Sequence, residues 1–338
     1  MSTAEQPPPD AQLMQMLFGF MASRSVSAVT ALDVPDALKD GPRSVEDLAQ
    51  TVGAHQDSLR RVMRTLVSIG VFAEPEPGTY ALTPVSELLR SDATPSMRDM
   101  AVLITAQSHW QPWGRFADTL KTGKSGSQHA FGTDAFSWFQ QSENKPEWDL
   151  FNAAMTSFSS GTSMAVVEAY DFSRFTTIAD IGGGHGFLLK TVLSKAPEAR
   201  GVLFDLPGAV EGADRASLGE RVECVSGSFF ETVPEGADCY TLKHIIHDWD
   251  DERCRTILSH IATAMAPSGR VLVVETVMPD GPEPHPAKLM DLNMLAMTEG
   301  GTERTRDEFA AVFASAGLEL VEIHPTESPV SIVEAKKA

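Results

Sequence analysis

The second half of the chain alternates strand-like and helix-like runs, and no other feature of the sequence constrains the fold as much. Runs typical of strands occupy positions 177–181, 201–204, 222–225, 237–246, 270–277, 318–323 and 329–334. Helix-like segments separate most of them, which is typical of a mainly parallel, doubly wound α/β sheet. The last two runs have no helix between them, so we expect the final strand to lie antiparallel to its neighbour.

The region before residue 172 is helical in pattern. Apolar residues recur at helical spacing near the start, at Leu13, Met14, Leu17, Phe18 and Met21. A cap at Ser44 and a stop at Gly53 predict a further helix. Positions 58–70 predict an amphipathic helix, and positions 71–82 a β-hairpin around a Pro-Gly turn. Helix, helix, hairpin is the winged-helix order, so we expect such a domain over 1–95.

Composition excludes several classes of partner. The chain of 338 residues has 27 basic and 46 acidic residues, a formal charge of −19, which disfavours binding to nucleic acid or to an anionic membrane surface. No apolar run reaches membrane-spanning length and no secretory leader is visible. Three cysteines without a C-x-x-C pair argue against a disulfide framework. We therefore expect a cytoplasmic protein.

A glycine-rich loop follows the first strand of the α/β region. The segment Asp180-Ile181-Gly182-Gly183-Gly184-His185-Gly186 joins strand 177–181 to a helix start, and glycines there let the backbone approach a ligand closely. Asp205 ends the next strand, where a carboxylate can accept hydrogen bonds from ribose hydroxyls. The dinucleotide fingerprint G-x-G-x-x-G/A is not completed, which leaves S-adenosylmethionine, a dinucleotide or a bare tight turn as interpretations.

Four ordered motifs resemble one family, the S-adenosylmethionine-dependent small-molecule O-methyltransferases of the plant caffeic-acid type and bacterial family 2. They are D-x-G-G-G-x-G with Asp-Leu-Pro at 205–207, L-K-x-x-x-H-D-W-x-D-E at 242–252, G-G-x-E-R-T at 300–305 and F-N-x-A-M at 151–155. The resemblance covers nearly the whole chain. It implies a class I methyltransferase (Rossmann-like) catalytic domain over 173–338 that binds S-adenosyl-L-methionine, helices over 96–172 that build the substrate pocket, and an all-α winged-helix domain that makes a homodimer.

The resemblance also implies roles for individual residues. The cofactor-binding positions are Asp180, Gly182, Gly184, Asp205, Leu206, Ser228, Phe229 and Lys243. His247 matches the catalytic base, and Glu275 and Glu303 match the two acids that flank it. The substrate-binding positions are Phe151, Asn152, Met155, Asp248 and Thr298. Plant members have Asp where Ser228 stands and tend to have Asn where Thr298 stands.

These residue types suit methyl transfer to a hydroxyl. A phenol ionises near pH ~10, so a base helps at neutral pH, and histidine, with a pKa of ~6.5, can serve as that base. A carboxylate on the other ring nitrogen would hold the tautomer and stabilise the imidazolium. Aromatic residues in the helices before residue 172 suggest a flat aromatic acceptor. We therefore expect a small hydroxylated substrate, His247 as the base and no metal site.

Alternatives stay open at this point. His247 can be a buried core histidine, Glu275 a charge at a strand end, and Glu303 a helix-capping acid. A metal set would draw on His244, His247, Asp248 and Asp250. A further alternative is a protein with the methyltransferase fold that catalyses decarboxylation or hydroxylation instead of methyl transfer. A DNA-binding regulator would use the arginines of the second helix, Arg60, Arg61 and Arg64.

Overall fold

The computed structural model describes residues 7–338, apart from the side chains of Phe158 and Ser160. By its internal contacts the chain divides into two compact units, Met1–Trp110 and Gln111–Ala338. No helix of the described part is long and apolar enough to cross a membrane.

The first unit is helical with a small sheet. Its elements are α1 (Pro9–Ala31), α2 (Val34–Ala37), β1 (Arg43–Ser44), α3 (Val45–Val52), α4 (Gln56–Ser68), β2 (Phe72–Glu76), β3 (Thr79–Leu82), α5 (Pro84–Glu87), α6 (Arg98–Leu103) and the start of α7 (Gln107–Gly114). Ser44 caps α3 by accepting a hydrogen bond from the Asp47 N–H, and Gly53 ends α3 at φ +66°. The predicted helix, helix and hairpin are confirmed, and β1 adds a third strand beside β3.

The second unit holds the α/β sheet. Its helices are α8 (Phe116–Thr122), α9 (Gly126–Phe131), α10 (Ala135–Phe139), η1 (Ser142–Asn144), α11 (Lys145–Ala169), α12 (Phe187–Lys195), α13 (Pro207–Gly212), α14 (Arg215–Leu218), η2 (Ile246–Asp248), α15 (Asp251–Ala264), α16 (Pro286–Met297) and α17 (Arg306–Ser315). Its strands are β4 (Thr177–Ile181), β5 (Arg200–Asp205), β6 (Val222–Ser226), β7 (Cys239–Lys243), β8 (Arg270–Glu275), β9 (Leu318–Pro325) and β10 (Ser331–Lys337).

The seven strands lie in the order β6-β5-β4-β7-β8-β10-β9. The first five are parallel, and β10 is antiparallel to both β8 and β9. This confirms the predicted doubly wound sheet and its antiparallel last strand. One predicted strand was too long: the run 237–246 forms a strand only over Cys239–Lys243, because His244 at φ +54° turns the chain into η2.

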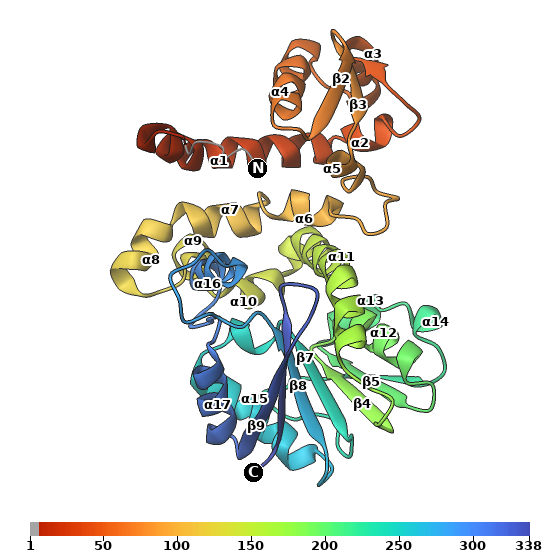
Figure 1. Ribbon diagram of the computed structural model, residues 1–338, viewed down its shortest axis with the longest axis vertical. Coiled ribbons are helices and arrows are strands. Elements are labelled where there is room, and N and C mark those ends of the chain that lie inside the picture. Colours follow the sequence, from red (N-terminus) through yellow and green to blue (C-terminus); the bar gives the residue numbers. More distant parts are fainter. Residues whose placement is uncertain (1–6) are drawn as a thin grey trace, which may run out of the picture. The chain divides into compact units, whose positions relative to one another are not determined.

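Both faces of the sheet are buried, and alternate residues of one strand enter different cores. In β8, Val271 and Val273 pack with α15 and α17, whereas Leu272 and Val274 pack with α11 and α12. Figure 1 shows these helix pairs on opposite sides of the sheet. Burial on two faces explains why the strands read as continuous apolar runs.

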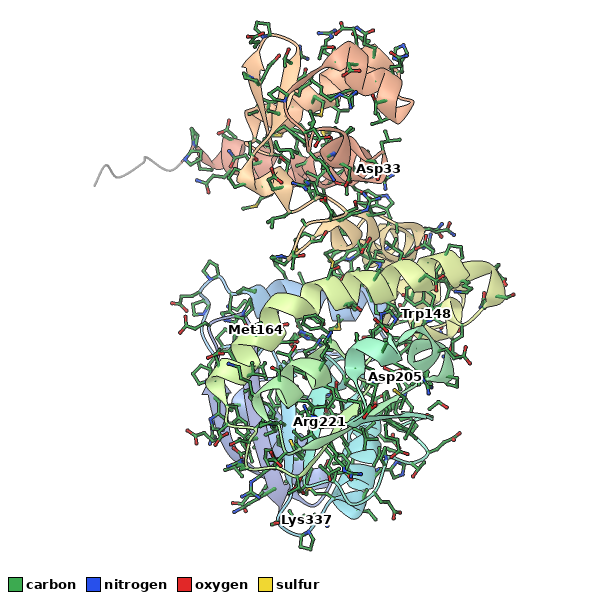
Figure 2. The ribbon with its side chains drawn as sticks, turned by 90° about the vertical axis from the view of Figure 1, so that its right-hand side faces the viewer. Asp33, Trp148, Met164, Asp205, Arg221 and Lys337 are labelled. Carbon is green, nitrogen blue, oxygen red and sulfur yellow. The ribbon has the colours of Figure 1, made fainter. Side chains whose placement is uncertain are left out.

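Parallel strands place their carboxyl ends at one edge of the sheet. Ile181, Asp205, Lys243 and Glu275 are the last residues of β4, β5, β7 and β8. Figure 2 labels Asp205 at this edge and Lys337 at the opposite end of the sheet. Ligands of open α/β sheets bind outside the carboxyl ends, so the candidate site belongs at this edge.

Candidate functional site

The glycine loop crosses from β4 to α12 in a backbone form that glycine favours. Gly182 has φ +67° and donates its N–H to the Phe204 carbonyl at 2.8 Å. A Cβ at Gly182 would clash with the side chain of Ile245. Gly184 has φ +57°, and a Cβ there would meet no other protein atom within 4 Å. The loop is therefore packed against the protein at Gly182 and has open space beside Gly184.

Two acids lie beneath this loop. Asp205 accepts hydrogen bonds from the N–H groups of Gly184 at 2.7 Å and Leu206 at 2.6 Å, and burial raises its pKa. Asp180 is buried and accepts a hydrogen bond from Thr241 Oγ1 at 2.7 Å. Burial raises the pKa of Asp180 to about 6. Paired carboxyl groups at an open glycine loop suit a ligand that carries hydroxyls and a positive charge.

Lys243 and Phe229 complete the predicted cofactor positions. Lys243 donates from Nζ to Ser159 Oγ of α11 at 2.6 Å, and burial lowers the pKa of Lys243 to about 8. The Phe229 ring lies edge-on to Trp249 at 6.2 Å between centroids, which makes an aromatic wall that can cover a purine. The Ser228 hydroxyl accepts the N–H of Phe230 at 3.3 Å.

Glu275 holds the backbone before and at His247. Its Oε1 accepts the N–H of Ile245 and the N–H of His247, each at 3.1 Å. The side chain is 1% exposed, and burial raises the pKa of Glu275 to about 7. The two hydrogen bonds fix the course of the chain from β7 into η2, whereas the imidazole ring has a different partner.

That partner is Glu303. His247 Nδ1 and Glu303 Oε1 are 2.6 Å apart, and both side chains are buried. His247 Nε2 lies 3.6 Å from Asp248 Oδ1. Burial by itself would lower the pKa of His247, but the charge of Asp248 and the hydrogen bond to Glu303 outweigh it and raise the pKa to about 9. Burial raises the pKa of Asp248 to about 6. With Nδ1–H donating to Glu303, the neutral ring has its lone pair on Nε2.

The segment 300–305 is tied to the same turn. Thr302 donates its N–H to the His247 carbonyl at 2.8 Å, and Glu303 donates its N–H to Asp291 Oδ1 at 2.9 Å. A Cβ at Gly301 would clash with Thr298 Oγ1 and the His247 carbonyl oxygen, so this position has room for glycine alone. Sequence reasoning missed Arg304, the residue directly after Glu303, whose guanidinium is buried against the same turn. Its place directly after Glu303 in the motif was the available signal.

The predicted substrate positions on α11 lie in an aromatic cluster. Phe151 packs against Phe139 at 5.1 Å and Trp148 at 5.8 Å between ring centroids, and Phe136 stacks on Trp249 at 5.5 Å. The cluster therefore reaches the turn that carries His247. Figure 2 labels Trp148 on α11.

The other predicted substrate positions use their polar groups locally. Asn152 Nδ2 donates to the Trp148 carbonyl at 3.0 Å, and Met155 accepts Ser159 Oγ at its carbonyl. The Thr298 hydroxyl donates to the Met294 carbonyl at 2.9 Å. Within residues 7–338, no group of three or more His, Cys, Asp or Glu side chains is placed to hold a metal ion.

Known proteins resemble this chain along nearly its whole length. Residues 113–319 match a family model described as the O-methyltransferase domain, and residues 14–92 match one described as the O-methyltransferase dimerisation domain. Phenazine O-methyltransferase PhzM of Lysobacter antibioticus is 41% identical over 329 residues, 96% of this chain and 95% of that protein. The crystal structure of LaPhzM matches with a TM-score of 0.94 at 39% identity, over 98% of this chain and 100% of that one. CalO1, a methyltransferase in calicheamicin biosynthesis solved in its SAH-bound form, matches with a TM-score of 0.84 at 33% identity, over 100% of both chains.

Proposed function

Because the chain belongs to the S-adenosylmethionine-dependent O-methyltransferases and has their class I methyltransferase fold, we propose that it methylates a hydroxyl of a small aromatic molecule with His247 as general base. One observation carries the assignment of the base. The buried contact of 2.6 Å between His247 Nδ1 and Glu303 Oε1 holds the ring in the tautomer that leaves Nε2 free to accept a proton.

In the proposed reaction the acceptor oxygen loses a proton and gains a methyl group. His247 Nε2 would take the proton of the acceptor hydroxyl, and the oxygen would receive the methyl group from S-adenosylmethionine, with S-adenosylhomocysteine as the leaving group. S-adenosylmethionine, when bound, supplies a methyl group that is already electrophilic. Glu303 and Asp248 then stabilise the imidazolium. Holding the oxygen in line with the methyl group is the other contribution of the protein.

The glycine loop is the proposed cofactor site. Asp205 and Asp180 are the candidates to bind the hydroxyl and cationic groups of S-adenosylmethionine, and Phe229 is the candidate to cover its adenine. The open space beside Gly184 supports this assignment because it lies at the carboxyl edge, next to Asp205. Lys243, held by Ser159, joins this site to helix α11.

The aromatic cluster supports a flat acceptor. Phe136, Trp148 and Phe151 are partly exposed rings of α10 and α11 that form one cluster with the buried Phe139, and Phe136 stacks on Trp249 two residues after His247. Aromatic rings favour offset-stacked or edge-to-face contacts with other rings. The similarity to an enzyme named for phenazine methylation supports the same class of substrate.

The removal of the imidazole tests the base. In single-turnover methyl transfer, His247→Ala should lower the rate by roughly 10²–10⁴-fold, the usual range for a positioned general base. Affinity for S-adenosylhomocysteine, measured by calorimetry, should stay unchanged, since the imidazole acts on the acceptor. His324→Ala is the matched control, because His324 Nε2 also contacts a glutamate, Glu334, at 2.9 Å but lies on β9. A His247→Ala rate within about threefold of wild type would remove His247 as the base.

A further inference from the structure

Arg304 is a buried arginine that reaches into the turn of the proposed base. Its side chain is 2% exposed. Nη1 donates to the Ile246 carbonyl at 2.9 Å, and Nη2 donates to the Trp249 carbonyl at 2.9 Å. These two carbonyls flank His247 and Asp248 on either side. The guanidinium therefore spans the turn that carries the base.

Two oppositely charged side chains hold the backbone of this turn: one binds its N–H groups and the other its carbonyl groups. The carboxylate of Glu275 takes the N–H groups of Ile245 and His247, and the guanidinium of Arg304 takes the carbonyls of Ile246 and Trp249. An anion that accepts from N–H groups and a cation that donates to carbonyls both form charge-assisted hydrogen bonds, which are stronger than neutral ones. The backbone on both sides of His247 is thus held in place.

Arg304 is itself fixed. Asp251, the first residue of α15, receives Nη2 at 2.8 Å and Nε at 3.2 Å, and the Arg304 carbonyl accepts the N–H of Met278 at 2.9 Å. Glu303, the preceding residue, holds the ring of His247. One short segment therefore sets both the orientation of the imidazole, through Glu303, and the position of its backbone, through Arg304.

We infer that Arg304 is a positioning residue for methyl transfer, which acts through His247 and has no contact with the acceptor or the cofactor. The inference rests on the proposed role of His247 as the base. A misplacement of about 1 Å at a reacting group can cost roughly 10²-fold in rate. Lysine cannot replace the guanidinium, because its single ammonium lacks the planar fork that reaches two carbonyls and a carboxylate at once.

The substitution Arg304→Lys tests this inference while it retains the positive charge. We expect the single-turnover rate to fall by roughly 10–100-fold, with the affinity for S-adenosylhomocysteine unchanged. Arg270→Lys is the matched control: Arg270 also donates to two carbonyls, those of Ser268 and Gly269, and to a carboxylate, Glu334, but it begins β8 at the opposite edge of the sheet. Its rate should stay within about threefold of wild type.

The acidity of the acceptor separates positioning from a loss of folded protein. If Arg304 acts through the base, the rate loss in Arg304→Lys should shrink as acceptors with more acidic hydroxyls are used, since these need less help from a base. A loss of folded enzyme would lower the rate equally for every acceptor. An equal loss across the series would overturn the inference.

Two further variants keep the test decisive. Asp251→Ala removes the carboxylate that orients the guanidinium, and the Asp251 side chain is 78% exposed, so the substitution leaves no cavity in the core. We expect a smaller loss of rate, about three- to tenfold, with the same dependence on acceptor acidity. This variant decides the matter if Arg304→Lys does not bind S-adenosylhomocysteine. The double variant His247→Ala, Arg304→Lys should be no slower than His247→Ala alone, because residues that act as one unit are not additive.

The outcomes distinguish the role of Arg304 from the proposed role of His247 as the base, on which it rests. A His247→Ala rate close to wild type would remove the proposed base. If His247→Ala loses 10²-fold or more and Arg304→Lys stays within about threefold of wild type, the role of Arg304 alone is overturned. Additive losses in the double variant would also overturn it.

Discussion

At the scale of single residues, the imidazole of His247 is governed by two opposing effects. Burial disfavours its charged form, while Asp248, Glu303 and Glu275 favour it, and the carboxylates prevail with a pKa of about 9. That value lies close to the ~10 of a phenol, so a proton can pass between the two groups at little cost. The ring is then mostly protonated at neutral pH, and the fraction able to accept a proton rises with pH.

The pH dependence of the rate follows from this balance. In the wild type, kcat/KM should rise with pH, reach the midpoint of the rise near pH 9 and level off above it, as the neutral imidazole is formed. Glu303→Gln removes a negative charge and the charged hydrogen-bond partner of Nδ1, which lowers the pKa of His247 and moves the midpoint of the profile to lower pH. The plateau should also fall, because the ring is less well oriented. The pH profile of both enzymes, with an acceptor that does not ionise in the range, measures this, and an unchanged midpoint would contradict it.

At the scale of elements, the loop between β4 and α12 is packed against the protein at one end and borders open space further along. Gly182 touches Ile245, the residue that leads into η2, and Gly184 faces open space. The loop that we propose to bind the cofactor and the turn that we propose to carry the base are therefore in contact. This brings the two reactants to one edge of the sheet.

Gly184→Ala places a methyl group in that open space. The substitution is strained at φ +57°, by roughly 1–2 kcal/mol, so its control is a glycine with similar strain and similar space. Gly236, at φ +82° with no atom within 4 Å of a Cβ, is such a position and precedes β7 at the other edge of the sheet. Calorimetry with S-adenosylhomocysteine should show affinity lost in Gly184→Ala and kept in Gly236→Ala. Equal affinities in the two variants would argue against the loop as the cofactor site.

At the scale of the whole molecule, the first unit carries an apolar helix that its own fold does not cover. The exposed apolar side chains of α1 are between 44% and 76% exposed, at Leu13, Met14, Met16, Leu17, Phe18, Phe20 and Met21. A contiguous apolar surface of this kind marks an interaction site. Together with the match of residues 14–92 to a dimerisation domain, it leads us to propose a homodimer built on this unit.

Light scattering tests the proposed dimer. The wild type should have twice the chain mass of 36.5 kDa, and Leu17→Glu should shift the protein toward that single-chain mass, since a charge on α1 would have to be buried. Val321→Glu, which changes another exposed apolar residue, on β9, should leave the dimer intact. A monomeric wild type at micromolar concentration, or a Leu17→Glu dimer as stable as the control, would refute the proposal.

The sequence by itself determined the local elements and their order. The cap at Ser44, the glycine loop at 182–186 and the capping box of Thr305 and Glu308 depend on residues within a few positions, so their signals could be read directly. The alternation of apolar runs after residue 172 was equally informative, because a sheet buried on both faces needs apolar residues throughout its strands. The end of β7 was different: Ile245 and Ile246 continue the apolar run, and only the turn at His244 takes them out of the strand.

The tertiary structure decided which groups meet. Both Glu275 and Glu303 were predicted beside His247, but their separations of 28 and 56 residues do not tell which one reaches the ring and which one the backbone. No role was predicted for Arg304 from the sequence, although it belongs to the motif at 300–305; in the fold its guanidinium is buried and donates to two carbonyls of the turn at 246–249. Hydrogen bonds between neighbours in the chain form wherever the local sequence allows them, whereas these contacts exist only once strands β7 and β8 pair and the segment 300–305 folds across their ends.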